Sequence, residues 1–312
     1  MARCFVFPGQ GSQVVGMGRA LADAFPAARE VFEEVDDALG RRLTRIMWEG
    51  PAEDLNLTVN TQPALMAHSL AMVRALEKEA KVDFADARFL AGHSLGEYSA
   101  LCAARAISIA DAARLLNTRG EAMQAAVPAG EGAMAALLGL DIAAAEKAIA
   151  ETDGALGVCE IANDNAPGQV VISGARARVE AAAEAAKRHG AKMAKLLAVS
   201  APFHCSLMKS AADVMAQALA NTKIAAPATP IVANVTARPT ESPAEIRDLL
   251  VRQVTGRVRW TESIAYMAAE GGDKFIEIGS GKVLAGLIKR IARDAVIMSL
   301  GEPGDIDAFH KA

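Results

Sequence analysis

The sequence is poor in cysteine, which bounds both its chemistry and its expected compartment. Only Cys4, Cys102, Cys159 and Cys205 occur in 312 residues, and no two of them form a C-x-x-C pair. Scattered cysteines argue against a zinc site and against a disulfide framework, and they favour a reducing compartment. We therefore expect no metal site and a cytoplasmic protein.

The sequence also lacks a long apolar run and a strong excess of one charge. No stretch reaches the roughly 18 apolar residues that a membrane span requires, and the N-terminal run stops at Pro8, too early for a signal-peptide core. The formal net charge of -4 gives no long-range attraction to nucleic acid or to an anionic membrane. Neither nucleic acid nor a membrane is an expected partner.

What is present is a high hydrophobic fraction, 52%, in alternating strand-like and helix-like segments. A chain of this length buries a large core, and this alternation is typical of an α/β protein. We expect strands at 4–7, 230–235, 274–278 and 295–300. We expect helices at 20–39, 63–80 with Pro63 in its first turn, 95–105, 108–126, 206–219, 243–254 and 260–270, and a further helix that ends at 292. Residues 301–312 should form a loose tail.

The most informative stretch runs from Arg88 to Ala100, where an apolar strand leads into Gly92-His93-Ser94-Leu95-Gly96. Glycine two positions to either side of Ser94 permits a sharp strand-to-helix turn that exposes the hydroxyl, as in a nucleophile elbow. A helix starting near Leu95 would direct its free N–H groups toward an oxyanion formed there. The alternative is a capping box, in which Ser94 and Glu97 merely cap that helix.

Two further side chains could complete an acyl-transfer site. His204 lies in a short loop between an expected strand and an expected helix, where it could serve as the base that a serine nucleophile needs. Arg119 is flanked one helical turn away by apolar residues, so its charge should require an anion. Alternatively, His204 is only a packed loop residue, and Arg119 either forms an internal ion pair or extends its charged end into solvent.

Between residues 128 and 198 the pattern changes to strand, helix, strand, strand, helix, strand, at 133–140, 141–151, 156–161, 169–173, 175–189 and 192–197. This βαββαβ order describes a ferredoxin-like unit inserted in a larger domain. We therefore divide the chain into 1–127 with 199–312 as the large domain and 128–198 as the inserted one.

Neither of two glycine-containing loops matches a phosphate-binding motif. Gly9-Gln10-Gly11 lacks the third glycine of a dinucleotide loop because Val14 stands there, and Gly281-Lys282 is followed by Val283 where a P-loop requires Ser or Thr. No nucleotide cofactor is expected. The first loop could instead bring a backbone N–H to a reacting carbonyl.

Seven segments in one order resemble the malonyl-CoA:acyl carrier protein transacylases of fatty-acid synthesis. They are FVFPGQGSQ from Phe5, GHSLGEYSA from Gly92, NTRGEAMQ from Asn117, NAPGQVVISG from Asn165, SAPFHCSLM from Ser200, VRQ from Val251 and EIGSGKVLAGL from Glu277. The resemblance covers about residues 3 to 300. It implies an α/β-hydrolase-like large domain with a mainly parallel sheet, interrupted by a ferredoxin-like small domain.

The resemblance also implies roles for individual residues. Ser94 would be acylated and His204 would act as base and then acid, oriented by the main-chain carbonyl of Gln253. Arg119 would pair bidentately with the malonate carboxylate.

Four more positions are implied to bind substrate. The backbone amides of Gln10 and Leu95 would form the oxyanion hole, and Asn165, in a loop of the small domain, would lie near the cleft. Phe203 stands where several bacterial members have serine, so we expect a narrower pocket and poor use of methylmalonyl-CoA.

The implied reaction is ping-pong: malonyl passes from CoA to Ser94 and then to the phosphopantetheine thiol of acyl carrier protein. It uses no cofactor, its partners are malonyl-CoA and acyl carrier protein, and we expect a monomer. One alternative is a serine hydrolase or thioesterase with an acid between Ser94 and His204, such as Asp153 or Asp164. Another is a catalytically silent module of a larger synthase.

Overall fold

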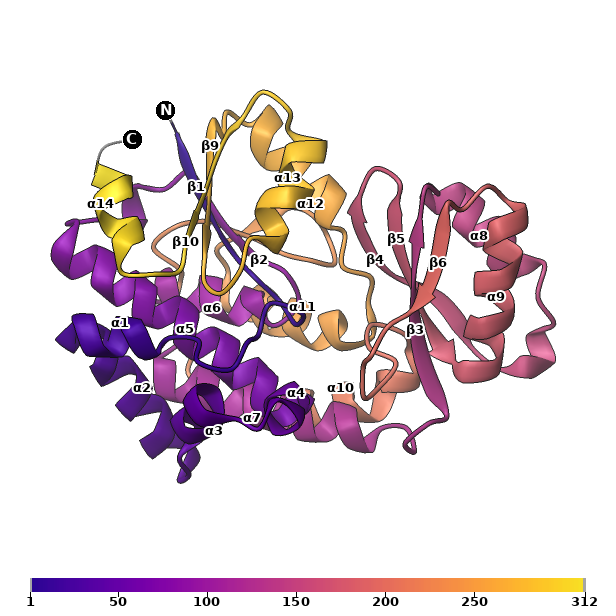
Figure 1. The fold of residues 1–312 in the computed structure, drawn as a ribbon, viewed down its shortest axis with the longest axis horizontal. Helices are drawn as coiled ribbons and strands as arrows, with labels where there is room; N and C mark the ends of the chain where they lie inside the picture. The colour runs from indigo at the N-terminus through magenta and orange to yellow at the C-terminus, as the bar shows by residue number, and fades with distance from the viewer. Residues whose placement is uncertain (1, 311–312) are drawn as a thin grey trace.

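The computed structural model describes residues 2–310 and contains two β-sheets, each with its own helices (Figure 1). The larger sheet has six strands in the order β10-β9-β1-β2-β7-β8, and the smaller has four in the order β4-β5-β3-β6. The predicted α/β class is confirmed.

The large sheet is parallel except at one edge. Its strands are β1 (Arg3–Phe7), β2 (Phe89–Gly92), β7 (Ile231–Val232), β8 (Pro239–Thr240), β9 (Lys274–Ile278) and β10 (Val296–Leu300), and only β8 runs antiparallel to its neighbour. In the central pair, Phe7 is in register with Gly92, so β1 and β2 end together. Loops that follow these two strands therefore meet at one edge of the sheet, where parallel sheets bind ligands.

Helices cover both faces of this sheet. Successive β1 side chains point to opposite faces, and they are apolar on both, so each face must be buried. Phe5 and Phe7 join one buried cluster, and Cys4 and Val6 join another. The helices are α1 (Arg19–Ala24), α2 (Pro26–Leu39), α3 (Leu43–Glu49), α4 (Ala52–Asn56), α5 (Thr58–Glu79), α6 (Gly96–Ala103), α7 (Ile109–Ala125), α10 (Lys209–Ala220), α11 (Pro243–Thr255), α12 (Trp260–Ala269), α13 (Val283–Ile291) and α14 (Gly304–His310).

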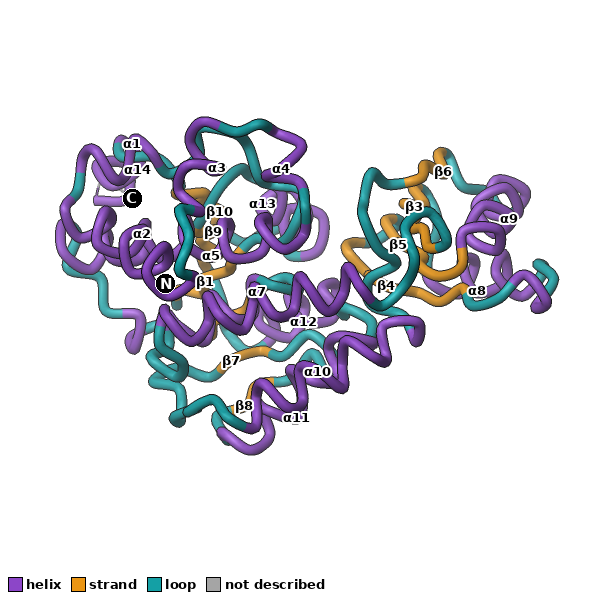
Figure 2. The backbone as a smooth tube through the Cα atoms, turned by 90° about the horizontal axis from the view of Figure 1, so that it is seen from below, coloured by secondary structure: helices purple, strands orange, loops and turns teal. Residues whose placement is uncertain are grey.

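The small sheet is antiparallel throughout and follows the βαββαβ order. Its elements are β3 (Gly132–Leu138), α8 (Ile142–Ala150), β4 (Cys159–Ala166), β5 (Gln169–Ala175), α9 (Arg176–Arg188) and β6 (Met193–Leu196). Figure 2 shows α8 and α9 on the side of this sheet that faces away from the large sheet. Between the helices and the sheet lies a third buried cluster that includes Leu137, Ile172 and Val179.

Several expected boundaries were wrong. The helix expected at 20–39 is broken at Phe25 into α1 and α2. Helix α5 begins at Thr58, so Pro63 lies inside it rather than in the first turn. Proline has no N–H to offer the carbonyl of Val59, four residues earlier. Arg41 Nη2 donates to that carbonyl instead, at 3.4 Å.

Two segments expected to be irregular are ordered elements, and one short strand lies where no element was expected. The loop expected after residue 161 is largely strand, because β4 continues to Ala166 with register shifts on the way. The short β8 was not expected. The tail expected to be loose forms α14 at 304–310, held by the buried Ile306, while 311–312 lie outside the described residues.

None of the helices within residues 2–310 combines the length and the apolar character needed to cross a bilayer.

Candidate active site

Ser94 occupies a strained turn between β2 and α6. Its φ is 51°, a left-handed conformation that is uncommon for residues other than glycine. A Cβ at Gly92 would lie 1.9 Å from the carbonyl of Gly96, and a Cβ at Gly96 would lie 2.3 Å from the carbonyl oxygen of Phe7. Glycine at both positions is therefore a steric requirement of this turn.

The capping-box interpretation is wrong. The residue at the N-cap of α6 is Leu95, and no side-chain hydrogen bond caps this helix. Glu97 points elsewhere: its Oε2 accepts from the backbone N–H of Asn234 at 3.1 Å and from Gln253 Nε2 at 2.8 Å.

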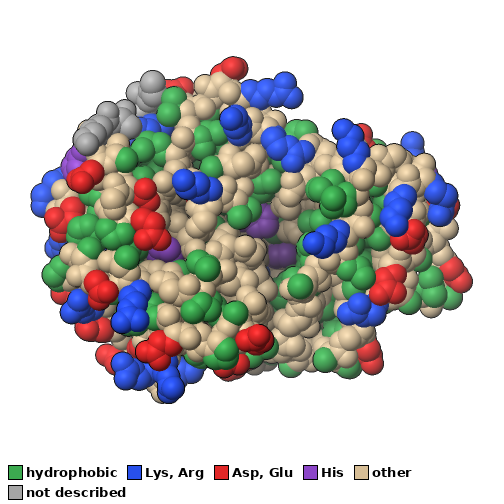
Figure 3. All heavy atoms as spheres, viewed as in Figure 1, with side chains coloured by type: hydrophobic (Ala, Val, Ile, Leu, Met, Phe, Trp, Pro, Cys, Tyr) green, Lys and Arg blue, Asp and Glu red, His purple; other side chains and the backbone are tan. Residues whose placement is uncertain are grey.

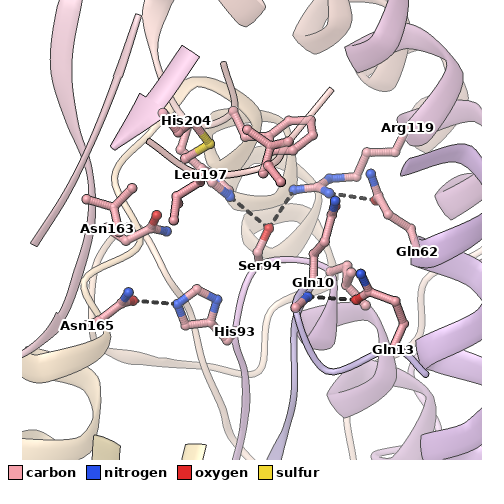
Figure 4. A pocket seen from close by; sticks show the side chains of 17 residues that line it. Gln10, Gln13, Gln62, His93, Ser94, Arg119, Asn163, Asn165, Leu197 and His204 are labelled. Carbon is pink, nitrogen blue, oxygen red and sulfur yellow. Dashed lines mark hydrogen bonds between the residues drawn. The ribbon is translucent and has the colours of Figure 1, made fainter. Parts of the chain in front are cut away.

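Ser94 and His204 form a hydrogen-bonded pair, with 2.7 Å between Ser94 Oγ and His204 Nε2 (Figure 4). His204 Nδ1 lies 2.9 Å from the carbonyl oxygen of Gln253 and 3.2 Å from that of Gly256. A carbonyl oxygen only accepts, so Nδ1 carries the proton and Nε2 is free to accept the serine proton. Burial, assisted by the charge of Arg119, lowers the pKa of His204 to about 3, so the imidazole is neutral near pH 7.

No carboxylate among residues 2–310 orients this histidine. The two acids considered for a hydrolase triad have other partners: Asp153 accepts from the backbone N–H of Ala155, and Asp164 accepts from Thr261 Oγ1. The geometry is that of a serine–histidine dyad held by main-chain carbonyls.

Arg119 reaches the dyad from α7 and is only 2% exposed. Its Nη1 donates to Gln62 Oε1 at 2.6 Å, and its Nη2 donates to Ser94 Oγ at 3.1 Å and to Gln253 Oε1 at 2.9 Å. All three acceptors are neutral oxygens, so within the described chain the guanidinium forms no ion pair. The approach of α7 to α5 requires Gly120, where a Cβ would lie 2.6 Å from Val59 Cα.

The loop after β1 lies against the elbow. A Cβ at Gly9 would lie 2.8 Å from the carbonyl oxygen of His93, and Thr58 Oγ1 donates to Gln10 Oε1 at 3.2 Å. The backbone N–H groups of Gln10 and Leu95 have no hydrogen-bond partner among residues 2–310. Both residues line the same pocket as Ser94.

That pocket has a volume of ≈ 340 Å³ and lies where the two sheets meet. Figure 3 shows histidine side chains at the bottom of a hollow in the middle of the molecule. Asn165 lies on β4 rather than in a loop, and its Oδ1 accepts a hydrogen bond from His93 Nε2 at 2.8 Å, which links the small sheet to the elbow. Phe203 lines the pocket and is 8% exposed.

Residues 4–300 match the family described as "Acyl transferase domain". The malonyl CoA-acyl carrier protein transacylase of Escherichia coli K12 is 48% identical over 304 residues, which are 97% of this chain and 97% of that protein. The acyl-carrier-protein S-malonyltransferase of Bartonella henselae superposes with a TM-score of 0.97 at 52% identity, covering 100% of this chain and 99% of that one. The chain belongs to the malonyl-CoA:acyl carrier protein transacylase family.

Another transacylase, solved in complex with a type II PKS acyl-carrier protein, has a TM-score of 0.94 at 43% identity and covers 99% of this chain and 98% of its own. The resemblance read from the seven sequence segments is thereby confirmed.

The pocket of this transacylase depends on residues that sequence patterns did not single out. Asn234 Oδ1 accepts from the backbone N–H of Ser94 at 2.7 Å, and its Nδ2 donates to the carbonyl of Gly92 at 2.6 Å. Gln62 joins Arg119 to Thr58, and Asn163 lines the pocket. Asn234 could have been found, because it follows β7, and the carboxyl ends of parallel neighbours such as β2 and β7 meet at one edge.

Proposed function

We propose that this chain transfers the malonyl group of malonyl-CoA to the phosphopantetheine thiol of acyl carrier protein through a malonyl-serine at Ser94. The observation that carries the proposal is the buried Arg119 guanidinium, which donates directly to the hydroxyl of a serine–histidine dyad. A site for uncharged acyl groups has no reason to hold a desolvated cation beside its nucleophile. A carboxylated acyl group would supply an anion in direct contact with the guanidinium.

In the first half-reaction Ser94 Oγ attacks the thioester carbonyl while its proton passes to His204 Nε2. The negative charge that develops on the carbonyl oxygen is stabilised by the free N–H groups of Gln10 and Leu95. When the tetrahedral intermediate collapses, the C–S bond breaks and His204 gives the proton to the departing CoA thiolate. Malonyl-Ser94 and free CoA result.

In the second half-reaction the carrier thiol gives its proton to His204, and its sulfur attacks the malonyl-serine carbonyl. The C–O bond then breaks, and Ser94 Oγ takes the proton back. Main-chain carbonyls suffice to orient His204 because the imidazolium exists only briefly and Gln253 and Gly256 both face its Nδ1. Each cycle restores the neutral dyad.

Arg119 binds the malonyl carboxylate bidentately in this scheme, since a planar guanidinium matches carboxylate geometry. Gln62 fixes the orientation of the guanidinium. Phe203 narrows the pocket beside the acyl group, and Asn165 stabilises the elbow from the small sheet through His93.

The small sheet and its helices form the inserted domain, 128–198, and the remaining segments, 1–127 and 199–312, form the large domain in this proposal. The buried cluster between the small sheet and its own helices supports this division. The pocket lies between them and receives residues from both.

The proposal is tested by following labelled malonyl-CoA with and without holo-acyl carrier protein. We expect the label to appear on carrier protein when it is present, and little free malonate when it is absent. Release of malonate at the same rate in both cases would identify a hydrolase and overturn the proposal.

A further inference from the structure

Glu97 is a buried carboxylate directly beneath the nucleophile that the reaction above does not use. It is 3% exposed and lies in the first turn of α6. Its Oε2 accepts from the backbone N–H of Asn234 and from Gln253 Nε2. These two donors also hold the site, since the Asn234 side chain bonds the elbow backbone and Gln253 Nε2 donates to the carbonyl of Ser94 as well.

Gln253 connects Glu97 to Arg119. One side-chain amide donates through Nε2 to the carboxylate and accepts through Oε1 from Arg119 Nη2. The buried cation and the buried anion are therefore separated by a single polarised amide group. Because Arg119 has only neutral oxygens as direct partners, Glu97 is the counter-charge that the fold provides.

The other titratable groups around Glu97 leave this pairing undisturbed. His204 is neutral near pH 7 because burial lowers its pKa, and burial likewise lowers the pKa of His93. Burial raises the pKa of Tyr98, the next residue on α6, to about 12. Among residues 2–310, Arg119 from α7 is the one cation that acts on Glu97, while Gln253 from α11 and Asn234 after β7 contribute only neutral donors.

We propose that Glu97 balances the charge of Arg119 in the empty site and takes up a proton from solvent when the malonyl carboxylate binds Arg119. The proposal rests on the function proposed above. With the malonyl group in place, two carboxylates would face one buried guanidinium, and keeping both ionised in a dry site costs more than protonating one of them. When malonyl leaves for the carrier thiol, Glu97 returns the proton to solvent.

The hydrogen bonds decide which oxygen receives the proton. Oε2 already accepts two N–H donors, whereas Oε1 has no hydrogen-bond partner within residues 2–310. A proton on Oε1 therefore leaves both existing bonds intact. Burial raises the pKa of Glu97 to about 7, against the lowering effects of Gln253, Asn234 and Arg119, so the empty site is poised for this change near neutral pH.

Because proton uptake is linked to binding, the affinity for malonyl-CoA must depend on pH. Above the pKa of Glu97 in the empty site, one proton must enter with each malonyl group, so malonyl-CoA affinity falls about tenfold for each unit of pH. Below that pKa the proton is already present and affinity no longer depends on it. Acetyl-CoA, which has no acyl carboxylate, should bind without this proton.

The test is calorimetric titration of malonyl-CoA into Ser94→Ala, which cannot be acylated, in buffers with different ionisation enthalpies. At about pH 8.5 we expect uptake of nearly one proton with malonyl-CoA and none with acetyl-CoA, and at about pH 6 uptake should be small with both. Equal uptake for the two thioesters at the higher pH would overturn the proposal without any variant of Glu97.

Glu97→Gln, added to Ser94→Ala, is the sharper variant because the amide imitates the protonated acid. Its oxygen can accept both existing bonds, and its NH₂ takes the place of the protonated Oε1. We expect proton uptake to disappear and malonyl-CoA affinity to become flat with pH. Glu33→Gln removes the same charge from the exposed face of α2 and should leave the uptake unchanged. A pH slope that persists in Glu97→Gln would contradict the proposal.

Failure of this inference is distinguishable from failure of the proposed function. If unaltered enzyme forms malonyl-Ser94 but malonyl-CoA binding takes up no proton, only the role of Glu97 is wrong. If no malonyl-Ser94 forms, the proposed function itself is wrong.

Discussion

At the residue scale the site depends on one buried cation, Arg119, whose hydrogen-bond partners are all neutral oxygens. Arg119→Ala removes the group that we expect to bind the malonyl carboxylate. We predict a loss of about 100-fold or more in kcat/KM for malonyl-CoA, the size of effect expected when one partner of a buried charge pair is removed. Acetyl-CoA should lose much less and serves as the control. Equal losses for the two thioesters would make the arginine a structural residue.

His204 gives a prediction with a defined sign. Its pKa is lowered by burial to about 3 in the folded protein, below the ordinary value of 6.5. The imidazole therefore stays neutral well below pH 6.5. As pH is lowered, the rate of Ser94 acylation should not fall with an apparent pKa near 6.5. Between pH 6.5 and 3, His204 binds a proton in the unfolded chain but not in the folded chain, so the free energy of unfolding falls as pH falls from 6.5 toward 3. Rapid-quench acylation and thermal unfolding over this pH range would check both statements.

Phe203 lines the pocket beside the dyad. Phe203→Ser should create room for one extra methyl group and raise kcat/KM for methylmalonyl-CoA relative to malonyl-CoA by about tenfold or more, as one methyl group in an apolar pocket commonly does. Competition between the two thioesters measures this ratio directly. If the unaltered enzyme already used both equally well, Phe203 would have no part in selection.

At the scale of elements, the turn from β2 into α6 is the most exacting. Gly96→Ala would place a Cβ 2.3 Å from the carbonyl oxygen of Phe7, which is backbone and has little freedom to move. We predict a destabilisation of about 1–3 kcal/mol, measured by thermal or denaturant unfolding.

Gly286→Ala is the matched control. Gly286 lies within α13, and a Cβ there would contact no atom within 4 Å. Alanine in a helix interior should stabilise by about 0.5–1 kcal/mol relative to glycine. If Gly96→Ala and Gly286→Ala changed the free energy of unfolding equally, crowding at the elbow would make no contribution to stability.

Elements were predictable from sequence where a local rule determined them. The glycine spacing around Ser94 identified the elbow, and the helix expected at 108–126 is confirmed as α7, with Ser108 accepting from the N–H of Asp111 as its N-cap. The placement of Pro63 was wrong because the first turn of a helix is only a preferred position for proline. Arg41 donates to the Val59 carbonyl that Pro63 cannot serve, and this tertiary hydrogen bond allows proline within α5. The order of α14 likewise depends on burial of Ile306 against the rest of the fold.

At the scale of the whole molecule, the pocket is assembled from segments that are far apart in the chain. Ser94, Arg119 and His204 were each identified from their surroundings in sequence, and the family resemblance suggested that they meet. Gln62 and the bonds of Glu97 were missed because such polar contacts become visible only when β7, α5, α6 and α11 are brought together. Tertiary hydrogen bonds between distant segments have no periodic signature.

The most direct test of the account is intact-protein and peptide mass spectrometry after mixing the enzyme with malonyl-CoA alone. We predict a gain of one malonyl group, located on the peptide that contains Ser94, absent from Ser94→Ala, and lost when holo-acyl carrier protein is added. A malonyl group on another residue, or turnover to carrier protein by Ser94→Ala, would contradict the central claim.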